Sequence, residues 1–494
     1  MTTKVQSLTI FREGIEPIFQ NKNLISLMKV TIIGAGLAGR EAAYQISKKG
    51  IPVDIFDMRP QKLTRAHKTG LCAELVCSNS FRGADLSNAV GLLKEELRIL
   101  GSLIMEAADH TRLPAGGALA VDRDKFSSYI DDKIRNNPLI NFHTKELSKL
   151  PDANPDKGEL VLVATGPLTG KELAEDLQRL TGSSHLAFYD AISPIILSSS
   201  IDHSVAFKQS RYDKGDSADY LNLPLSKEEY YTFVESVKNS EKFSGHEEVE
   251  SDSDYSAKET LRPFEGCMPI EDMVLRGPET LRFGPLKPVG LTDPRTGKRP
   301  YAVIQLRQDD TAGSLWSMVG FQTRMKHPEQ LRIFRTIPGL EEAEFVRLGS
   351  VHRNTFIDSP RCLDSTLQFR NRKGLFFAGQ ITGTEGYVES TAGGLLAGIN
   401  IARSAKNLPL ISVSTDTALG SLVTYISDPS RKYFQPMNIS FGLMPSYIDA
   451  PIPEGQKKLK DKKQKRLQVA SKAMKEMNCL KIQLTEEDEG HLTL

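Results

Sequence analysis

The sequence predicts an α/β protein: a parallel β-sheet with helices on both faces, assembled from two separated stretches of chain, with a large second domain inserted between them. Three observations predict this class. A strand–helix–strand pattern occupies residues 29–57, two apolar runs at 160–166 and 375–380 read as further buried strands, and the long stretch between those runs has a different, mixed character. A strand–helix–strand unit implies parallel strands with the connecting helix packed on the sheet.

The first unit begins with the apolar run Val30–Ile33, whose length and β-branching favour a strand over a helix. Helical spacing of small and apolar side chains follows through residues 38–46, and Gly50 ends the helix. A second strand begins at Val53 and ends at Asp57. These boundaries leave a short, tight turn between the first strand and the helix.

This turn carries GAGLAG, which matches the G-x-G-x-x-G pattern of dinucleotide-binding proteins. The first glycine permits the turn, the second lets the main chain approach a pyrophosphate, and the third allows the helix to pack closely on the strand. Free N–H groups at the helix N-terminus favour phosphates. Asp57, 18 residues beyond Gly39, is placed to accept a hydrogen bond from a ribose 2′-hydroxyl. The predicted cofactor-binding residues of the turn are Gly34, Ala35, Gly36, Leu37, Ala38 and Gly39.

A second glycine-rich stretch, residues 374–405, favours FAD over NAD as the dinucleotide. A strand there ends at Gly379, a loop with several glycines follows, and a helix of small residues opens around 391–394. Late in many flavoproteins, such a strand, loop and helix bring main-chain N–H groups to the flavin, so Gly379 and Gln380 are predicted contacts. The alternative is a second strand–helix turn with tight packing. The first interpretation makes the parallel-sheet domain a Rossmann-like FAD-binding domain.

The other segments differ from this domain in composition. Residues 239–260 are acidic and polar, which is typical of an exposed loop. Beyond Gln456 a basic run, KKLKDKKQKR, precedes an amphipathic stretch, for which we expect a solvated helix; an RNA-contacting arm is the alternative. The predicted segments are an N-terminal extension at 1–27, a discontinuous FAD-binding domain at 28–167 and 346–445, an inserted substrate domain at 168–345, and a basic, amphipathic C-terminal tail at 446–494.

Composition limits the class of protein further. Lysine and arginine number 63 against 62 aspartate and glutamate residues, so bulk charge indicates no polyanionic partner and leaves only a local basic patch. No apolar run is long enough for a transmembrane helix, which predicts no membrane partner. The five cysteines form no C-x-x-C pair, which argues against a disulfide framework and against a metal site. These features favour a reducing, cytoplasmic location.

Two of the five cysteines have surroundings that suit chemistry. Cys77 lies in ELVCSNSFRG and Cys267 in FEGCMPIE, where glycine or small polar neighbours allow a thiol to line a cleft. The thiolate is the nucleophilic form and needs nearby cations or N–H donors, for which Arg82 is the candidate beside Cys77. The other three are expected to be inert: Cys72, Cys362 and Cys479.

The motifs resemble those of the flavin- and folate-dependent tRNA (uracil-5-)-methyltransferases. The resemblance is carried by GAGLAG, AELVCSNSFRG, NAVGLLKEEL and PAGGALAVDR, and later by SRYDKG, FEGCMPIE, TLRFGPLKPVGL, RPYAVIQLRQD and FFAGQITGTEGYVES. It extends over residues 29–445. The blocks CSNS and EGCMPIE separate this family from the related one that installs carboxymethylaminomethyl groups on wobble uridines.

The resemblance implies an activity. In this family a methylene group from 5,10-methylenetetrahydrofolate, with reducing equivalents from NADPH or NADH passed through FAD, becomes a methyl group on C5 of a uridine in the tRNA T-loop. By position, the two functional cysteines of the family fall on Cys77 and Cys267. Cys267 is the expected nucleophile at uracil C6, because a soft thiolate suits conjugate addition. Cys77 is expected to act nearer the flavin, in proton transfer or protection, and the two roles remain exchangeable.

A uracil that reacts at a flavin must leave its stack, so the protein needs cations for phosphates and a flat surface for the base. The stretch LRFGPLKPVGLTDPRTGKRP supplies most candidates and SRYDKG supplies the rest, with ordinary solvated or ion-paired residues as the alternative. HRNTF, residues 352–356, is a candidate contact for flavin or folate, with loop hydrogen bonding as the alternative. The RNA-binding candidates are Arg282, Lys287, Arg295, Lys298 and Arg299, together with Arg211, Tyr212 and Lys214.

Three other functions remain open at this point. The same chemistry could act on ribosomal RNA, since the motifs would be nearly identical. A flavin oxidoreductase for small thiols or carbonyls would use Cys77 and Cys267 as a redox pair, and would need no folate. A non-catalytic flavoprotein that binds RNA is the third, and the intact CSNS and EGCMPIE blocks argue against it.

Overall fold

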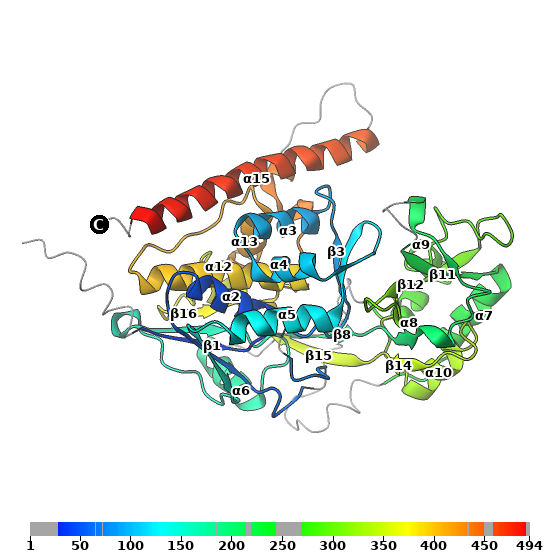
Figure 1. The fold of residues 1–494 in the computed structure, drawn as a ribbon, viewed down its shortest axis with the longest axis horizontal. Helices are drawn as coiled ribbons and strands as arrows, with labels where there is room; N and C mark the ends of the chain where they lie inside the picture. Colours follow the sequence, from blue (N-terminus) through cyan, green and yellow to red (C-terminus); the bar gives the residue numbers. More distant parts are fainter. Residues whose placement is uncertain are drawn as a thin grey trace, which may run out of the picture.

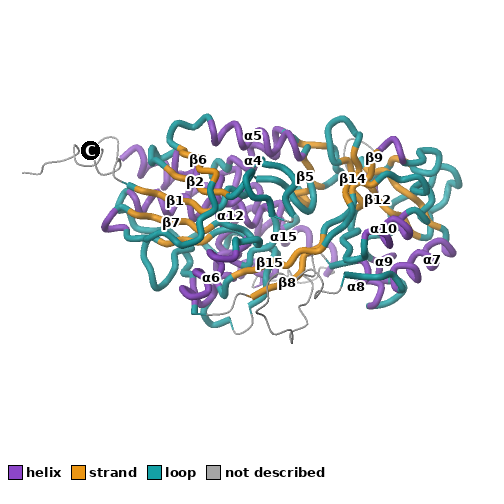
Figure 2. The backbone as a smooth tube through the Cα atoms, turned by 90° about the horizontal axis from the view of Figure 1, so that it is seen from below, coloured by secondary structure: helices purple, strands orange, loops and turns teal. Residues whose placement is uncertain are grey.

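The computed structural model describes residues 28–64, 66–71, 73–182, 186–213, 219–243, 268–431, 434–448 and 458–490. They form two bodies of secondary structure that lie side by side and are joined by a two-stranded ribbon (Figure 1 and Figure 2). The predicted extension at 1–27 and most of the acidic stretch at 239–260 lie outside the described residues.

A five-stranded parallel sheet forms the centre of the first body and confirms the predicted α/β class. Its strand order is β16-β7-β1-β2-β6. The sequence predicted four of these strands and missed β6, because INFHT at the sheet edge has only one buried residue and no apolar run. The strands are β1 (Lys29–Ile33), β2 (Val53–Asp57), β6 (Ile140–Thr144), β7 (Glu159–Val163) and β16 (Leu375–Phe377).

Two helices, α2 (Leu37–Ser47) and α12 (Tyr387–Ala405), cross closely beside this sheet. Their separation depends on glycines of α12. A Cβ on Gly398 would lie 2.8 Å from the Cα of Ala42, and one on Gly394 would overlap the main chain of Ala38. The small residues that predicted a flavin-type helix therefore serve first to bring α12 against α2.

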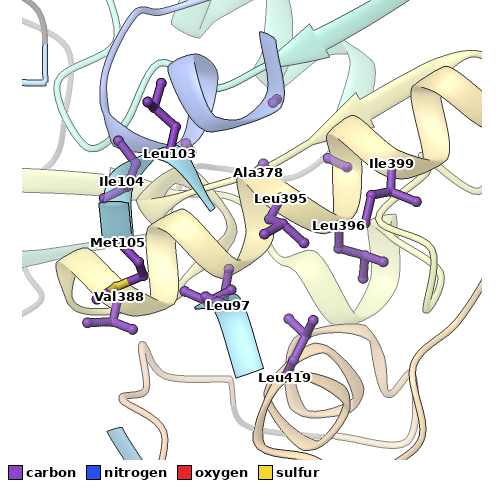
Figure 3. Close-up of a cluster of buried hydrophobic side chains, with 14 of the residues drawn as sticks. Leu97, Leu103, Ile104, Met105, Ala378, Val388, Leu395, Leu396, Ile399 and Leu419 are labelled. Carbon is purple, nitrogen blue, oxygen red and sulfur yellow. The ribbon is translucent and has the colours of Figure 1, made fainter. Parts of the chain in front are cut away.

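Further helices enlarge this core. Figure 3 shows apolar side chains of α3, α4 and α13 converging on those of α12. Glu96 of α3 is fully buried, and its carboxylate accepts the N–H groups of Ala418 and Leu419 at 2.7 and 2.8 Å, which satisfies the first turn of α13. The helices are α3 (Ala89–Ile99), α4 (Leu103–His110), α5 (Arg123–Arg135) and α13 (Ala418–Ser427).

The opposite face of the sheet has its own core, built with α6 (Lys171–Thr181). Leu173 and Leu177 of α6 are buried with Val161 and Val163 of β7. This helix lies in the range predicted for the inserted domain, yet its apolar side belongs to the first body. Short elements complete that body: α11 (Ser359–Cys362) and a small sheet of β3 (Ser80–Gly83), β4 (Arg112–Leu113) and β5 (Ala118–Val121).

The second body is an antiparallel sheet with helices around it, and it falls within the predicted insertion except for the last residues of β14. Its strand order is β10-β11-β12-β13-β9-β14, and it has a separate apolar core. Its strands are β9 (Ile195–Leu197), β10 (Phe207–Lys208), β11 (Tyr220–Leu225), β12 (Ala302–Gln308), β13 (Leu315–Met318) and β14 (Phe345–Arg347). Its helices are α7 (Lys227–Lys238), α8 (Ile270–Leu275), α9 (Thr280–Phe283) and α10 (His327–Phe334).

The ribbon between the two bodies consists of β8 (Leu186–Ala191) and β15 (Val351–Phe356), which pair antiparallel over six residues (Figure 2). One strand carries the chain into the inserted domain and the other carries it back. The two bodies are therefore connected by paired strands rather than by a single linker.

The C-terminal tail forms one long helix, α15 (Lys458–Gly490), that crosses the first body beside α3 and α13 (Figure 1). Its Val469, Ala470, Ala473 and Met477 are buried in the first core. The expected solvated helix is thus docked along one face. A short helix, α14 (Pro445–Ile448), precedes it. Among the described helices, none is both long and apolar enough to cross a bilayer.

Candidate active site

A cavity of about 400 Å³ lies where the carboxyl ends of the parallel strands meet the inserted domain. Ligands of open α/β sheets bind at this edge, and the volume is within the range of small-molecule sites. The first body lines the cavity with the turn after β1, the loop that carries Cys77 and the segment after β16. The inserted domain adds residues 317–320 and Arg307, so both bodies form the wall.

The turn after β1 is shaped by its glycines. Gly34 has a φ of 100°, and its N–H donates to the carbonyl of Phe56 at 2.8 Å. A Cβ there would overlap the main chain of Ala164, and a Cβ on Gly39 would overlap the carbonyl of Gly34. Gly36, the N-cap of α2, has open space at its Cβ position and lines the cavity. The first N–H groups of α2 lack intrahelical acceptors and open onto the cavity, which fits a pyrophosphate.

Asp57 lines the cavity at the end of β2, but its oxygens already have partners. One oxygen accepts the N–H of Ala35 at 2.8 Å, and the Arg59 side chain and main chain donate to the carboxylate at 2.9 to 3.2 Å. Burial alone would raise the pKa of Asp57, but hydrogen bonds and charge from Arg59 hold that pKa below its usual value. The carboxylate therefore braces the glycine turn, and Arg59 is a cavity residue that the sequence did not single out.

The segment after β16 closes the cavity from the other side. Gly379, with a φ of 80°, packs so closely on α2 that a Cβ would lie 2.9 Å from the Cβ of Ala38. Gln380 donates to both oxygens of the Glu385 carboxylate at 2.9 Å, and both residues line the cavity. Of the HRNTF candidates, Asn354 is a buried cavity residue.

Cys77 lies in this cavity against the hydroxyl of Tyr387, the first residue of α12. The sulfur and the Tyr387 oxygen are 3.0 Å apart. The same oxygen accepts the main-chain N–H groups of Cys77 and Ser78 at 3.0 and 3.1 Å, which leaves its own proton to be donated to the sulfur. Burial and the nearby Cys77 raise the pKa of Tyr387 well above its usual value, so the phenol keeps that proton.

Three arginines hold the Cys77 loop. Arg123 donates to the carbonyl of Leu75 at 2.5 Å and pairs with Asp309 of the inserted domain. Arg347 donates to the carbonyl of Val76 at 2.9 Å, and Arg307 donates to the side chains of Ser78 and Asn79, each at 2.8 Å. Burial and the charge of Arg123 lower the pKa of Arg347 to about 10. The cations beside Cys77 come mainly from these residues.

Arg82, the cation expected beside Cys77, is ion-paired with Glu389 of α12 and also lines the cavity. Its main chain has a φ of 64°. Lys94 of α3, which is fully buried, donates to the carbonyls of Phe81, Arg82 and Gly83 at 2.7 to 3.3 Å. Burial lowers the pKa of Lys94 to about 7, with the Arg82 charge contributing. This contact holds the strand that follows the Cys77 loop.

Cys267 and Cys72 lie outside the described residues. The chain resumes directly after Cys267 with Met268, which is buried, and the N–H of Ile270 donates to the carbonyl of the cavity residue Gln322 at 2.8 Å. Cys362 is buried, and burial with the charge of Asp358 raises its pKa to about 11, as suits an inert thiol. Cys479 is exposed on α15.

The RNA-binding candidates divide into paired and exposed residues. Arg282 donates to the carbonyl of Tyr301 at 3.0 Å, lies over its ring and pairs with Glu279. Arg295 pairs with Asp293 at 3.0 Å. The remaining described candidates show a range of burial, with Lys287 and Arg211 half-buried and Lys298, Arg299 and Tyr212 exposed. Lys214 lies outside the described residues.

Within the described part of the chain, no group of three or more His, Cys, Asp or Glu side chains is arranged to hold a metal ion. The polar groups of the cavity include glycine-turn N–H groups, carboxylates, guanidinium groups and the thiol of Cys77. This donor set suits an organic cofactor that carries phosphates.

Comparisons with known proteins give first the class and then the family. A family model described as glucose inhibited division protein A matches residues 29–409. Two solved structures of GidA from Aquifex aeolicus have TM-scores of 0.65 and 0.62 at 17% identity, covering 94% and 93% of this chain and 75% and 78% of theirs. The fold is thus that of the GidA class.

Closer similarity is found to proteins named methylenetetrahydrofolate–tRNA-(uracil-5-)-methyltransferase TrmFO. The protein of Natranaerobius thermophilus is 53% identical, covering 91% of this chain and 99% of its own length. That of Listeria monocytogenes is also 53% identical, covering 90% and 97%. The chain belongs to this methyltransferase family, which confirms the resemblance seen in its motifs.

Sequence reasoning missed the residues that surround Cys77. Tyr387 stands in EGYVES, Arg307 in VIQLRQD and Arg123 in ALAVDR, all within quoted blocks, but nothing local assigned them to the cysteine. Arg347 stands in FVRLGS, outside those blocks. Only the folded chain brings the four residues to one loop.

Proposed function

We propose that this protein methylates C5 of a uridine in the T-loop of tRNA. The one-carbon unit would come from 5,10-methylenetetrahydrofolate, with NADPH or NADH as reductant and FAD as the bound cofactor. The observation that carries the proposal is a family-specific cysteine, Cys77, held against Tyr387 in a cavity that also contains a dinucleotide-type glycine turn. The relatives named above are tRNA (uracil-5-)-methyltransferases that use methylenetetrahydrofolate. We place the protein in the cytoplasm, as its cysteine pattern predicts.

The residues present fit FAD. Gly34 and Gly36 with the first turn of α2 would hold the pyrophosphate, and Gly379 and Gln380 would lie beside the flavin. Because Arg59 donates to its carboxylate, we assign two roles to Asp57: it supports the glycine turn, and it would accept a hydrogen bond from the ribose. When bound, FAD supplies the redox chemistry that turns a methylene group into a methyl group.

The two cysteines would handle the uracil. The thiolate of Cys267 would add to C6, which makes C5 nucleophilic. C5 would attack the methylene carbon, the bond between that carbon and its nitrogen carrier would break, and C5 would lose its proton. One hydride equivalent, drawn from NADPH or NADH, would make the carbon a methyl group as the thiolate leaves C6 and the C5–C6 double bond is restored. Cys77 would act in proton transfer, because the Tyr387 hydroxyl donates to its sulfur and the arginines around its loop are cationic, as a thiolate requires.

In this proposal the target base reaches the cavity beside the inserted domain, where residues 317–320 and Arg307 form the wall. Lys287, Lys298 and Arg299 are proposed as phosphate contacts, with Arg282 and Arg295 positioned by their acidic partners. Extrusion of a stacked base costs a few kcal/mol, which such contacts would offset.

The test is methylation by the purified protein. Unmodified tRNA transcript, methylenetetrahydrofolate, FAD and NADPH or NADH are incubated with it, and digested RNA is searched for 5-methyluridine by mass spectrometry. Cys267→Ala should abolish product, whereas Cys479→Ala, which removes an exposed thiol on α15, should not. Product found only on ribosomal RNA fragments would mean that ribosomal RNA, rather than tRNA, is the substrate of the same reaction. Absence of product with a reducible flavin would refute the proposal in favour of a small-molecule oxidoreductase.

A further inference from the structure

Tyr212 stands out on the inserted domain as an exposed aromatic side chain in a strained conformation. It is 58% exposed, and its backbone has a φ of 59° and a ψ of 27°. The left-handed region costs a residue other than glycine roughly 1–2 kcal/mol, and such strain gathers at functional sites. Neither feature is explained by core packing, since more than half of the side chain faces solvent.

Hydrogen bonds connect this tyrosine to the wall of the cavity. The neighbouring Arg211 donates to the side chain of Gln305 at 2.8 Å. The main-chain carbonyl of Gln305 accepts the N–H of Val319 at 2.9 Å, and Val319 lines the cavity. The N–H of Tyr212 donates to the carbonyl of Gly290 at 3.1 Å, and its ring packs against that glycine. Tyr212 is therefore connected to the inserted-domain wall of the site through its neighbour Arg211 and through Gln305.

Cationic residues lie close to this wall of the site. Arg211 donates to the carbonyl of Pro285 at 3.4 Å, and Pro285 packs on the cavity residue Gly320, so the loop with Lys287 borders the cavity too. Arg282 precedes Phe283, which is 74% exposed. Cations beside exposed aromatic rings are the combination with which proteins bind unpaired nucleotides, since the ring stacks on a base while the cations meet phosphates.

We propose that Tyr212 is a stacking platform for the base next to the methylated uridine; this rests on the proposed function. Extrusion of the target base leaves its neighbour without a stacking partner. An exposed ring held on the inserted domain near the site would stack on the neighbouring base in its place. The occupant is an unpaired RNA base, recognised by its flat surface rather than by its hydrogen-bonding edge.

The experiment uses a tRNA stem-loop with 2-aminopurine beside the methylated uridine, whose position is first mapped with wild-type protein. Stacking on a tyrosine quenches the fluorescence of 2-aminopurine. Binding to wild type and to Tyr212→Phe should quench it, because the platform needs only the ring. Tyr212→Asn should not quench it, although asparagine tolerates the left-handed backbone and so leaves the local conformation in place.

Kinetics provide the second measurement. Tyr212→Asn and Tyr212→Ala should raise KM for RNA by about 5- to 150-fold, the range for loss of one base–aromatic stack. NADPH-driven flavin reduction without RNA should stay at the wild-type rate. Ile482→Ala on α15, at a site 56% exposed, is the control for loss of an exposed apolar side chain.

The outcomes separate the two proposals. If wild type does not methylate RNA, the proposed function fails. If wild type does so and Tyr212→Asn keeps both its KM and its quenching, only the platform is wrong. A slower flavin reduction in Tyr212→Asn, with unchanged KM for RNA, would also overturn the platform, because the ring would then serve the nicotinamide cosubstrate.

Discussion

Cationic side chains serve different purposes around the Cys77 loop and on the surface formed by residues 282–299. Arg123 and Arg347 are withdrawn from solvent and donate to main-chain carbonyls of the loop. Lys298 and Arg299 are exposed, and Arg295 pairs with Asp293, two residues before it. The first set fixes a backbone, whereas the second leaves its charges accessible.

This difference decides what each set contributes. When a buried carbonyl loses the side chain that donates to it, the free energy of unfolding falls by about 1–3 kcal/mol. This loss hardly depends on salt. An exposed ion pair contributes about 0–1 kcal/mol and is screened by salt. The loop is therefore built for position and the surface for contact with a charged partner. Four measurements sharpen or break this comparison.

The largest effect is expected for Cys77→Ala. Loss of a proton-transfer group should lower the methylation rate by about 10²- to 10⁴-fold, while flavin absorbance and RNA binding stay near wild type. Single-turnover kinetics and a filter-binding assay measure the two quantities. Cys362→Ala, at a buried cysteine away from the cavity lining, is the matched control. A rate within threefold of wild type would remove Cys77 from the mechanism.

The next effect concerns stability and pH. Burial raises the pKa of Glu96 to about 7, above its value of 4.5 in an unfolded chain. A carboxyl with a raised folded-state pKa contributes stability that is fully present below pH 4.5 and is lost as pH rises through about 7, amounting to roughly 3 kcal/mol. Urea unfolding at several pH values should show this fall in wild type and lose it in Glu96→Gln.

Two neighbours test that assignment. Glu95→Gln, on the same helix but partly exposed beside Arg98, is the matched control for loss of a glutamate from α3. Lys94, whose pKa burial lowers to about 7, titrates with the opposite sign, so stability should rise again above that pH. Identical slopes for wild type and Glu96→Gln would contradict a protonated, buried Glu96.

A smaller effect is expected for Arg347→Met. The carbonyl of Val76 would lose its donor and the Cys77 loop would loosen, so kcat/KM should fall by roughly 5- to 100-fold. Arg335→Met is the control, since the exposed Arg335 also donates to a main-chain carbonyl, that of Ala343 in the inserted domain, away from the cavity lining. Equal losses in the two variants would mean that the effect is general destabilisation.

The smallest effect is expected for Lys298→Ala. Removal of one phosphate contact should raise KM for tRNA a few-fold and reduce the slope of log KM against log salt by about 0.7–0.9. Lys157→Ala is the control, because Lys157 is exposed beside the amino-terminal end of β1, where Gly158 accepts from Lys29, opposite the cavity. An unchanged salt slope would place the RNA elsewhere.

Much of the first body could be predicted from sequence because its signals are local. The β1–α2–β2 unit follows from an apolar run, helical spacing and a glycine turn within a short stretch, and its observed boundaries agree with the prediction to within one or two residues. The antiparallel sheet of the inserted domain was not predicted. Its strands are short and pair with segments far apart in the chain, as β11 does with β12.

Two helices, α6 and α15, show the limit of composition as a guide to where a segment packs. α6 has the exposed charges of an inserted element, but Leu173 and Leu177 pack on the parallel sheet. α15 reads as a solvated basic helix, yet Val469 and Met477 are buried against the first body. In both cases the local sequence carries no signal of what the apolar side of the helix packs against.

By itself the sequence determined the glycine turn after the first strand, the two candidate cysteines and the family, because each depends on residues a few positions apart. Only the tertiary structure decided what surrounds Cys77. Tyr387 is 310 residues away, and Arg307 and Arg347 belong to the other body. Contacts of this kind depend on how two cores and a ribbon are packed together, and short-range spacing carries no signal of that packing.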